Sequence, residues 1–372
     1  MAVAIVSGTL AGKTGHGGIA WSRLSWVLGL RRLGFDTYFV EELARAASAD
    51  LSYFSEVTSR FGLSDRSTLL CPEGPVGLSR AELADVAADA GLLLNINGNL
   101  TDGAVKARAA CCIYLDDDPG FTQIWRAAGE QAHVLEGHDH YYTFGENIGK
   151  TFCPIPTVGI DWRPTRPPVV LDEWPVVTDG RRDVLTTVAT WRPGYGSVQY
   201  GGTTYGLKLH EFRKVIELPR HAPQRFELAL DIHQDERDDL ALLDRYGWQL
   251  VEPRQVAYSP DDFRRYIQGS GGEFSAAQGI YVETDSGWIS DRTVRYLSSG
   301  KPALVQDTGF SRNLPTGEGL LAYRTLDDAV AGAHALAGDY ESHATAARAF
   351  AETFFDSDEV LGRMLDEVGV AP

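Results

Sequence analysis

Apolar and polar positions in the first part of the chain follow two different periods. Residues 19–33 carry leucine and valine at helical spacing, and this pattern stops at Gly34. Short apolar runs predict buried strands at residues 3–6, 37–40, 92–96, 111–115 and 140–144. Strands that alternate with helices at this spacing are typical of a parallel sheet with helices on both faces.

A second series of the same kind follows a proline-rich break. The stretch DWRPTRPPVVLDEWP is too rich in proline for a helix or a central strand, so we interpret it as a linker. After it, the pattern predicts strands at 184–189, 226–231, 248–252, 273–276 and 303–306, and helices at 261–268, 291–299, 326–337 and 344–355. We therefore expect two doubly wound α/β domains, with ligands bound in a cleft between the carboxyl ends of their sheets.

Composition narrows the possible partners. The 372 residues suit two domains, and 34 basic against 51 acidic residues give a net charge of −17. Such a surface repels nucleic acid and anionic lipid, although one small phosphate ligand could still bind in a local pocket. No apolar run is long enough for a membrane span, the start MAVAIVSG has no basic leader, and the four cysteines form no CxxC pair. We expect a cytoplasmic protein with free core thiols.

The loop SGTLAGKTGHGGIAW joins the first predicted strand to the first helix. Its glycines let the backbone approach a ligand closely. Only three residues separate Gly8 from Gly12, so the loop does not fit a P-loop, which needs four. A histidine side chain has an unperturbed pKa near neutral pH, so His16 is a candidate general base. Gly17 and Gly18 beside it are candidate contacts for the acceptor substrate, the molecule from which this base would remove a proton. The alternative is a surface histidine in a mobile loop.

A second candidate region is TDSGWISDRTVRYLSSGKPALVQDTGF. Its helix begins at Ser290, and a helix N-terminus offers unpaired N–H groups and a partial positive charge to a phosphate. Arg292 and Thr293 could add donors. The following strand brings Asp307 and Thr308 to the same edge, where a carboxylate can bind sugar hydroxyls. The alternative is an ordinary capped helix followed by an acidic loop.

The stretch TWRPGYGSVQYGGTTYGLKLHEF follows the first strand of the second domain. Trp191 and Tyr195 offer flat faces to a base or a sugar, and Arg192 and Lys208 offer positive charge to a diphosphate. The alternative is a hairpin that binds a partner.

The stretch YLDDDPGF contains a possible metal-binding pair. Asp116 and Asp118 resemble the DxD pair of metal-dependent sugar transferases, whose oxygen ligands suit magnesium or manganese. Any run of three aspartates contains DxD, however, and Asp-Pro-Gly is a common turn. We interpret Asp116 and Asp118 as candidate contacts for an acceptor substrate that bears a hydroxyl or an amine. His138 and His140 lack a third zinc ligand at motif spacing, so no metal or other cofactor is expected.

Four stretches carry a resemblance to a known family. GEFSAAQGIYVETDSGWISDRTVRYLSSGKPALVQDTGF, LPTGEGLLAYRTLDDA and AARAFAETFFDSDEVL resemble the second domain of GT-B-type nucleotide-sugar-dependent glycosyltransferases, as found among actinobacterial and other bacterial enzymes. GHGGIAWSRLSWVLGLRRLGFDTYFVEE resembles the opening of their acceptor domain. The resemblance covers about residues 1–42 and 183–372. It implies an α/β fold with two Rossmann-like domains facing across a cleft, and a C-terminal helix that crosses back to the first domain.

The resemblance also implies domain boundaries and residue roles. It places an acceptor-binding domain at residues 1–165, a nucleotide-sugar-binding domain at 166–345, and the returning helix at 346–372. His16 matches the base of inverting members, and Asp307 matches the sugar-binding acid by order. The donor diphosphate would lie at the helix N-terminus opened by the residues Ser290, Arg292 and Thr293.

Two departures from the family pattern leave its finer properties open. The Glu-x7-Glu pattern of many retaining members is absent, and Arg295 stands about where its second glutamate would fall. The His-Cys-Gly-Trp-Asn-Ser signature of the plant-type inverting group is absent too. The donor base and the stereochemical outcome therefore stay open.

The sequence predicts a glycosyltransferase that needs no metal and moves a hexosyl or related sugar from a nucleotide sugar to a small-molecule acceptor, such as one in natural product biosynthesis. Two alternatives remain open. One is a sugar-nucleotide epimerase or hydrolase on the same architecture. The other is a sugar-nucleotide-binding module without turnover.

Overall fold

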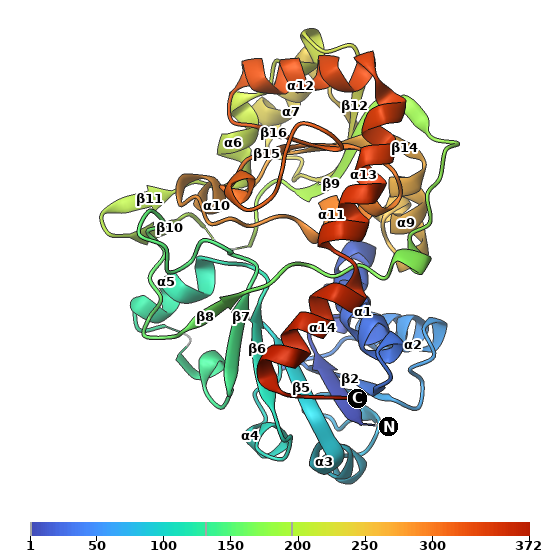
Figure 1. The fold of residues 1–372 in the computed structure, drawn as a ribbon, viewed down its shortest axis with the longest axis vertical. Coiled ribbons are helices and arrows are strands. Elements are labelled where there is room, and N and C mark those ends of the chain that lie inside the picture. Colours follow the sequence, from blue (N-terminus) through green and yellow to red (C-terminus); the bar gives the residue numbers. More distant parts are fainter. Residues whose placement is uncertain (1, 131, 195) are drawn as a thin grey trace. The chain divides into compact units, whose positions relative to one another are not determined.

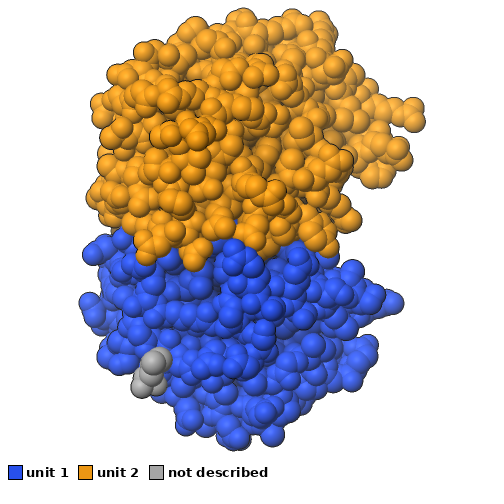
Figure 2. Space-filling model, turned by 90° about the vertical axis from the view of Figure 1, so that its right-hand side faces the viewer, with its two compact units in different colours: residues 1–145, 157–170, 356–372 blue, residues 146–156, 171–355 orange. Residues whose placement is uncertain are grey.

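The chain divides into two compact units, which we describe separately. The computed structural model describes residues 2–130, 132–194 and 196–372 (Figure 1). Unit 1 contains residues 1–145, 157–170 and 356–372, and unit 2 contains residues 146–156 and 171–355 (Figure 2). The chain thus enters unit 2 briefly before its second sheet begins, and it returns to unit 1 for its last helix.

Unit 1 is built on a sheet whose strands run in the order β4-β3-β2-β1-β5-β6-β7-β8. All neighbouring strands are parallel except β3 and β4. The strand order reverses between β1 and β5, which is the topological switch point where such sheets bind ligands. The strands are β1 (Val3–Ser7), β2 (Asp36–Glu42), β3 (Ser67–Leu70), β4 (Val76–Gly77), β5 (Ala90–Ile96), β6 (Cys112–Asp116), β7 (His140–Thr143) and β8 (Trp162–Pro164).

The last helix of the chain, α14, packs on the first, α1, within unit 1. A Cβ atom on Gly29 would lie 2.5 Å from Leu361 Cδ1, so the glycine lets the two helices approach without a shift of Leu361. α1 is buried on most sides because the sheet and α14 both cover it. The helices are α1 (Gly17–Arg32), α2 (Ser48–Arg60), α3 (Arg80–Asp89), α4 (Gly103–Lys106), α5 (Phe121–Ala127) and α14 (Ser357–Val368), with short 3-10 turns η1 (Ala11–Lys13) and η2 (Ala132–Leu135).

Unit 2 repeats the same plan. Its sheet is parallel throughout in the order β13-β12-β9-β14-β15-β16, and its switch point lies between β9 and β14. A separate antiparallel hairpin, β10–β11, follows β9. The strands are β9 (Arg181–Thr190), β10 (Val198–Tyr200), β11 (Thr203–Tyr205), β12 (Arg225–Asp231), β13 (Gln249–Val251), β14 (Ser270–Ser275), β15 (Ala303–Gln306) and β16 (Leu320–Tyr323).

An aromatic cluster lies at the centre of the unit 2 core. Phe212, Phe226, Trp248 and Phe274 pack with ring centroids 4.7–6.0 Å apart. The helices of unit 2 are α6 (Lys208–Lys214), α7 (Arg237–Tyr246), α8 (Pro253–Val256), α9 (Pro260–Gln268), α10 (Gly279–Glu283), α11 (Asp291–Ser298), α12 (Leu326–Gly338) and α13 (Tyr340–Phe354), with 3-10 turns η3 (Leu171–Glu173), η4 (Leu218–Arg220) and η5 (Phe310–Arg312).

The alternating strands and helices predicted from the apolar pattern are confirmed. The proline-rich stretch differs from a plain linker, because it contains the short edge strand β8. Pro164 is tolerated there, since an edge strand leaves one row of N–H positions unpaired. The roles predicted for residues 1–165, 166–345 and 346–372 stay predictions. Within the described part of the chain, we find no helix with the length and apolar character that crossing a membrane requires.

Candidate functional site

The loop between β1 and α1 lies at the switch point of unit 1. The backbone N–H of His16 donates to the Lys13 carbonyl at 3.1 Å, and His16 is the N-cap residue of α1 with an exposed side chain. Gly17 and Gly18 are the first two residues of the helix. The structure thus places the predicted base and its two neighbouring glycines together at the carboxyl end of β1.

A charged cluster that sequence reasoning missed lies at the carboxyl ends of the neighbouring strands. Arg23 Nη1 donates to Asp117 Oδ2 at 2.5 Å, and Asn97 Nδ2 donates to Asp117 Oδ1 at 2.5 Å. A Cβ atom on Gly8 would lie 2.9 Å from Arg23 Cδ, so this loop glycine makes room for the arginine. The available signal was polar residues directly after apolar strands, in LLLNINGN and YLDDDPGF.

Asp116, one of the two predicted acceptor contacts in this region, is closed off inside unit 1. Its side chain is fully buried, and Oδ2 accepts hydrogen bonds from Gln123 Nε2 and Thr143 Oγ1, both at 2.7 Å. Burial raises the pKa of this carboxyl to about 6. The neighbouring Asp118 is half-buried. Contacts of both residues with an acceptor stay predictions.

No group of three or more histidine, cysteine, aspartate or glutamate residues within 2–130, 132–194 and 196–372 has the arrangement of a metal site. Metal independence stays a prediction.

The N-terminus of α11 lies beside the switch point of unit 2. Ser290 is the N-cap residue, and its hydroxyl accepts a hydrogen bond from the Arg292 N–H at 3.2 Å. Thr293 is buried in the first turn. The structure therefore brings together the three residues predicted to open the diphosphate-binding helix.

Arg292 is held by both strands of the switch point. Its guanidinium donates to Glu273 Oε1 at 2.7 Å, to Ser275 Oγ at 2.7 Å and to the Val188 carbonyl at 2.8 Å. Burial acts to lower the pKa of Arg292, but the charge and the hydrogen bond of fully buried Glu273, together with smaller contributions from Tyr296 and Asp291, raise that pKa above the ordinary value. Arg292 thus fixes α11 against β14 and β9, and its contact with a diphosphate stays a prediction.

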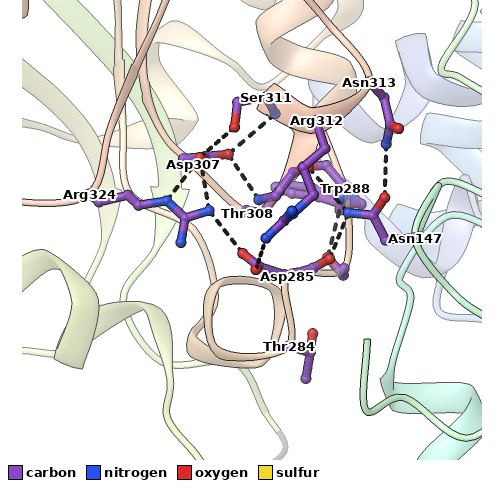
Figure 3. Close-up of polar contacts among 12 residues, drawn as sticks. Asn147, Thr284, Asp285, Trp288, Asp307, Thr308, Ser311, Arg312, Asn313 and Arg324 are labelled. Atoms are coloured by element: carbon purple, nitrogen blue, oxygen red, sulfur yellow. Dashed lines mark hydrogen bonds and ion pairs between the residues drawn. The ribbon is translucent and has the colours of Figure 1, made fainter. Parts of the chain in front are cut away.

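Asp307 lies directly after β15 and is already engaged (Figure 3). Its carboxylate accepts hydrogen bonds from Ser311 Oγ at 2.7 Å, from the Gly309 N–H at 2.9 Å and from Arg324 Nε at 3.0 Å. It is buried, with 5% exposure. The predicted sugar-binding acid therefore lies at the expected edge of the sheet, but its oxygens have partners within unit 2.

Asp285 extends this network on the other side of Arg324. It accepts from Arg324 Nη2 at 2.9 Å and from Arg312 Nη2 at 3.2 Å. Burial acts to raise the pKa of Asp285, but the two arginines outweigh it and lower that pKa below the ordinary value. The hydroxyl of buried Thr308 donates to the Trp288 carbonyl. Thr308 thus joins two turns, and its contact with a donor stays a prediction.

Asn147 connects the same turns through side-chain hydrogen bonds (Figure 3). Its Nδ2 donates to the Asp285 carbonyl at 2.8 Å and to the Gly309 carbonyl at 3.2 Å, while its Oδ1 accepts from Asn313 Nδ2 at 2.9 Å. Asn147 is 1% exposed. The short segment 146–156 is therefore an integral part of unit 2, which no local pattern in the sequence indicated.

The aromatic face predicted at Trp191 lies in the core of unit 2. The ring is 1% exposed and packs against Phe212, and its Nε1 donates to Asp239 Oδ2 at 2.8 Å. This packing leaves no face open to a base or a sugar, so donor contact by Trp191 stays a prediction that the geometry does not favour.

The rest of this glycine-rich stretch forms the hairpin β10–β11, as its alternative interpretation predicted, while the binding of a partner stays untested. Arg192 is ion-paired with Glu236, and half-buried Lys208 begins α6, where its N–H donates to Gln278 Oε1 at 2.8 Å. Tyr195 lies outside the described residues.

Surface shape alone would place the candidate site elsewhere on unit 2. A shallow hollow of about 270 Å³ lies near the amino end of β9, opposite the switch-point edge of the sheet. Both arginines that line it, Arg181 and Arg265, are ion-paired, with Glu227 and Asp262 respectively. We therefore place the candidate site by topology and polar geometry. The hollow is lined by Arg181, Gln255, Val256, Asp262, Arg265, Tyr266 and Gly269.

Solved structures resemble the chain over nearly its whole length. An alpha-glucosyltransferase in complex with UDP is 10% identical with a TM-score of 0.59, covering 99% of this chain and 100% of its own. Anabaena HepE in complex with UDP-glucose is 11% identical with a TM-score of 0.62, covering 98% and 99%. A glycosyltransferase involved in avilamycin A biosynthesis is 13% identical with a TM-score of 0.55, covering 98% and 96%.

These likenesses define the fold. The chain is an α/β protein with the GT-B fold of two Rossmann-like units, as the sequence predicted. No protein-family model matches the chain, and no curated protein sequence matches it significantly.

Proposed function

We propose that the protein is a glycosyltransferase that uses a nucleotide-sugar donor. One observation carries the proposal: both sheets have the doubly wound order, and each places polar side chains at its switch point. Its support comes from structures of similar architecture that hold UDP or UDP-glucose. These proteins are only 10–11% identical to the chain, so their likeness supports the fold, and the activity is our own inference.

In this proposal unit 2 binds the donor. The diphosphate accepts hydrogen bonds from the N–H groups that open α11, with the hydroxyls of Ser290 and Thr293 close by and Lys208 adding positive charge. Arg292 holds the helix against β14 and β9 through its hydrogen bonds to Glu273 and Val188. The departing diphosphate gains negative charge, and each well-placed donor that stabilises such charge contributes about 2.7–4 kcal/mol to catalysis.

Unit 1 supplies the acceptor site and the base. His16 removes a proton from an acceptor hydroxyl or amine, which attacks the anomeric carbon as the diphosphate leaves. We propose a small-molecule acceptor rather than a nucleic acid. One similar structure is an alpha-glucosyltransferase bound to a 13-mer DNA, but the net charge of −17 opposes a polyanionic acceptor here.

A ligand and turnover panel tests the proposal. The protein is heated with UDP, GDP, ADP and TDP, then incubated with the matching nucleotide sugars and a set of hydroxyl and amine acceptors, with and without EDTA. We expect one diphosphate to raise the unfolding temperature, and its sugar nucleotide to give a glycosylated acceptor with EDTA present.

Other outcomes of the panel would contradict the proposal. A product formed from the donor alone would indicate an epimerase or hydrolase. A donor that binds but stays intact with every acceptor would indicate a binding module. If activity is lost in EDTA and restored by magnesium, the prediction that no metal is needed is wrong, while the proposed sugar transfer stands.

A further inference from the structure

We propose that Glu41 is a positioning residue that fixes the loop bearing His16. This inference rests on the proposed function, because it matters for activity only if His16 is the base. Glu41 lies near the end of β2, next to the switch point of unit 1, and its side chain is 0% exposed. No feature of the sequence singled it out, since it is one of two adjacent glutamates after an apolar strand.

Both carboxylate oxygens of Glu41 bind the loop backbone. Oε2 accepts the N–H of Ala11 at 2.6 Å, and Oε1 accepts the N–H of Gly12 at 2.9 Å. These two N–H groups belong to η1, which precedes His16. Ionised carboxylates make stronger hydrogen bonds than neutral acceptors, so the pair forms a two-point tie between β2 and the loop.

The loop glycine at position 12 serves this tie. A Cβ atom there would lie 2.8 Å from Leu43 Cδ2 and 3.3 Å from Glu41 Oε1. A side chain at this position would therefore crowd Leu43 and the carboxylate of Glu41. The close approach of the loop backbone to Glu41 thus accounts for a glycine at position 12.

The tie reaches His16 through consecutive turns. The N–H of Thr14 donates to the Ala11 carbonyl at 3.1 Å, and the N–H of His16 donates to the Lys13 carbonyl at 3.1 Å. Thr14 Oγ1 also donates to Asp50 Oδ1 at 2.9 Å, which holds the loop from the side of α2. A shift at residues 11–12 therefore moves the residue at the start of α1.

Burying a carboxylate in a protein core is energetically unfavourable compared with burying an apolar side chain. Burial raises the pKa of Glu41, and the N–H groups of Gly12 and Ala11 act in the opposite direction. An apolar side chain of similar volume would fill the same space at lower cost. The charge is therefore explained by what it holds, which is the loop backbone.

The kinetic test uses Glu41→Gln and Glu41→Ala, with Asp36→Asn as the control. Asp36 lies at the opposite end of β2 and pairs with Arg66. We expect kcat to fall about 10-fold in Glu41→Gln, which keeps one acceptor oxygen, and about 100-fold in Glu41→Ala, because small displacements of catalytic groups have effects of this size. The Kd for the donor diphosphate should stay within about twofold, since unit 2 binds it, and Asp36→Asn should match the parent.

Hydrogen exchange provides a readout that needs no turnover. The amides of residues 11–16 should exchange faster in both Glu41 variants, while those of β1 and the middle of α1 stay protected. If the parent transfers no sugar yet exchange rises in this way, the proposed function fails and the loop tie stands. Unchanged exchange, or an active Glu41→Ala with parental kcat, would overturn the inference itself.

Discussion

At the scale of single residues, His16 is the side chain on which the chemistry depends. Its side chain is exposed at the start of α1, so its removal should alter catalysis and leave the fold intact. We expect His16→Ala to lose at least about 100-fold in kcat while donor binding and the unfolding temperature stay unchanged. Transfer assays and calorimetric titration of the diphosphate measure the two effects separately.

His221→Ala is the matched control for this variant. His221 is also an exposed histidine, but it precedes β12 and so lies at the amino end of the unit 2 sheet, away from the switch point. It should behave as the parent does. Parental activity in His16→Ala would remove His16 as the base.

Asp116 makes a pH-dependent prediction. Burial raises its pKa from an ordinary 3.8 to about 6, so the folded chain binds this proton more tightly than the unfolded chain. Its contribution to stability is therefore fully present below about pH 4 and is lost as the pH rises through about 6. Asp116→Asn cannot ionise, so its free energy of unfolding relative to the parent should rise by on the order of 2–3 kcal/mol from pH 4 to pH 7.

Urea titrations at both pH values measure this difference. Asp65→Asn is the control, because its side chain is 79% exposed, and its difference from the parent should change little over the same range. A constant difference between Asp116→Asn and the parent would show that this carboxyl ionises normally.

At the scale of elements, the Arg292–Glu273 pair joins α11 to β14. Removing one partner leaves a buried charge without compensation, so Arg292→Met should lower the free energy of unfolding by about 3–5 kcal/mol. The double variant Arg292→Met with Glu273→Met should show a smaller decrease in the free energy of unfolding than Arg292→Met alone, because no charge is left buried. Urea unfolding of the three proteins checks both statements.

The exposed pair Arg265–Asp262 on α9 is the comparison. Arg265→Met should change the free energy of unfolding by no more than about 1 kcal/mol, since exposed ion pairs contribute little. Equal losses in Arg292→Met and Arg265→Met would contradict the buried anchor of α11.

The elements also show what the sequence could and could not predict. Apolar runs predicted the central strands because parallel strands are buried on both faces and so read as continuous hydrophobic segments. The predicted helix at 344–355 begins later than α13, which starts at Tyr340, because Asp339 caps a polar first turn that the apolar pattern does not include. Helices such as α2 and α7 lacked a long apolar stripe and were not predicted.

The candidate site was predictable only in part. The N-terminus of α11 and the position of Asp307 follow from local order along the chain. The contacts of Asn147 with Asp285 join residues 138 positions apart, and those of Glu41 with Ala11 join residues 30 apart. No local pattern records such pairs, because tertiary packing alone creates them.

At the scale of the whole molecule, the net charge of −17 makes a prediction about acceptors. One similar structure is bound to a 13-mer DNA, yet this chain should show no binding to a duplex of that length at up to about 10 μM in 150 mM salt. Fluorescence anisotropy of a labelled duplex measures it. Binding that weakens steeply as salt rises would contradict a small-molecule acceptor and favour a nucleic acid.

The repeated strand order gives the molecule two switch points, and we propose that the donor diphosphate binds at the one in unit 2. A crystal structure of the protein with UDP, or with whichever diphosphate raises its unfolding temperature, tests that assignment most directly. We predict phosphate oxygens within hydrogen-bond distance of the N–H groups of residues 291–293. A nucleotide bound in the hollow beside Arg181, with the start of α11 untouched, would contradict it.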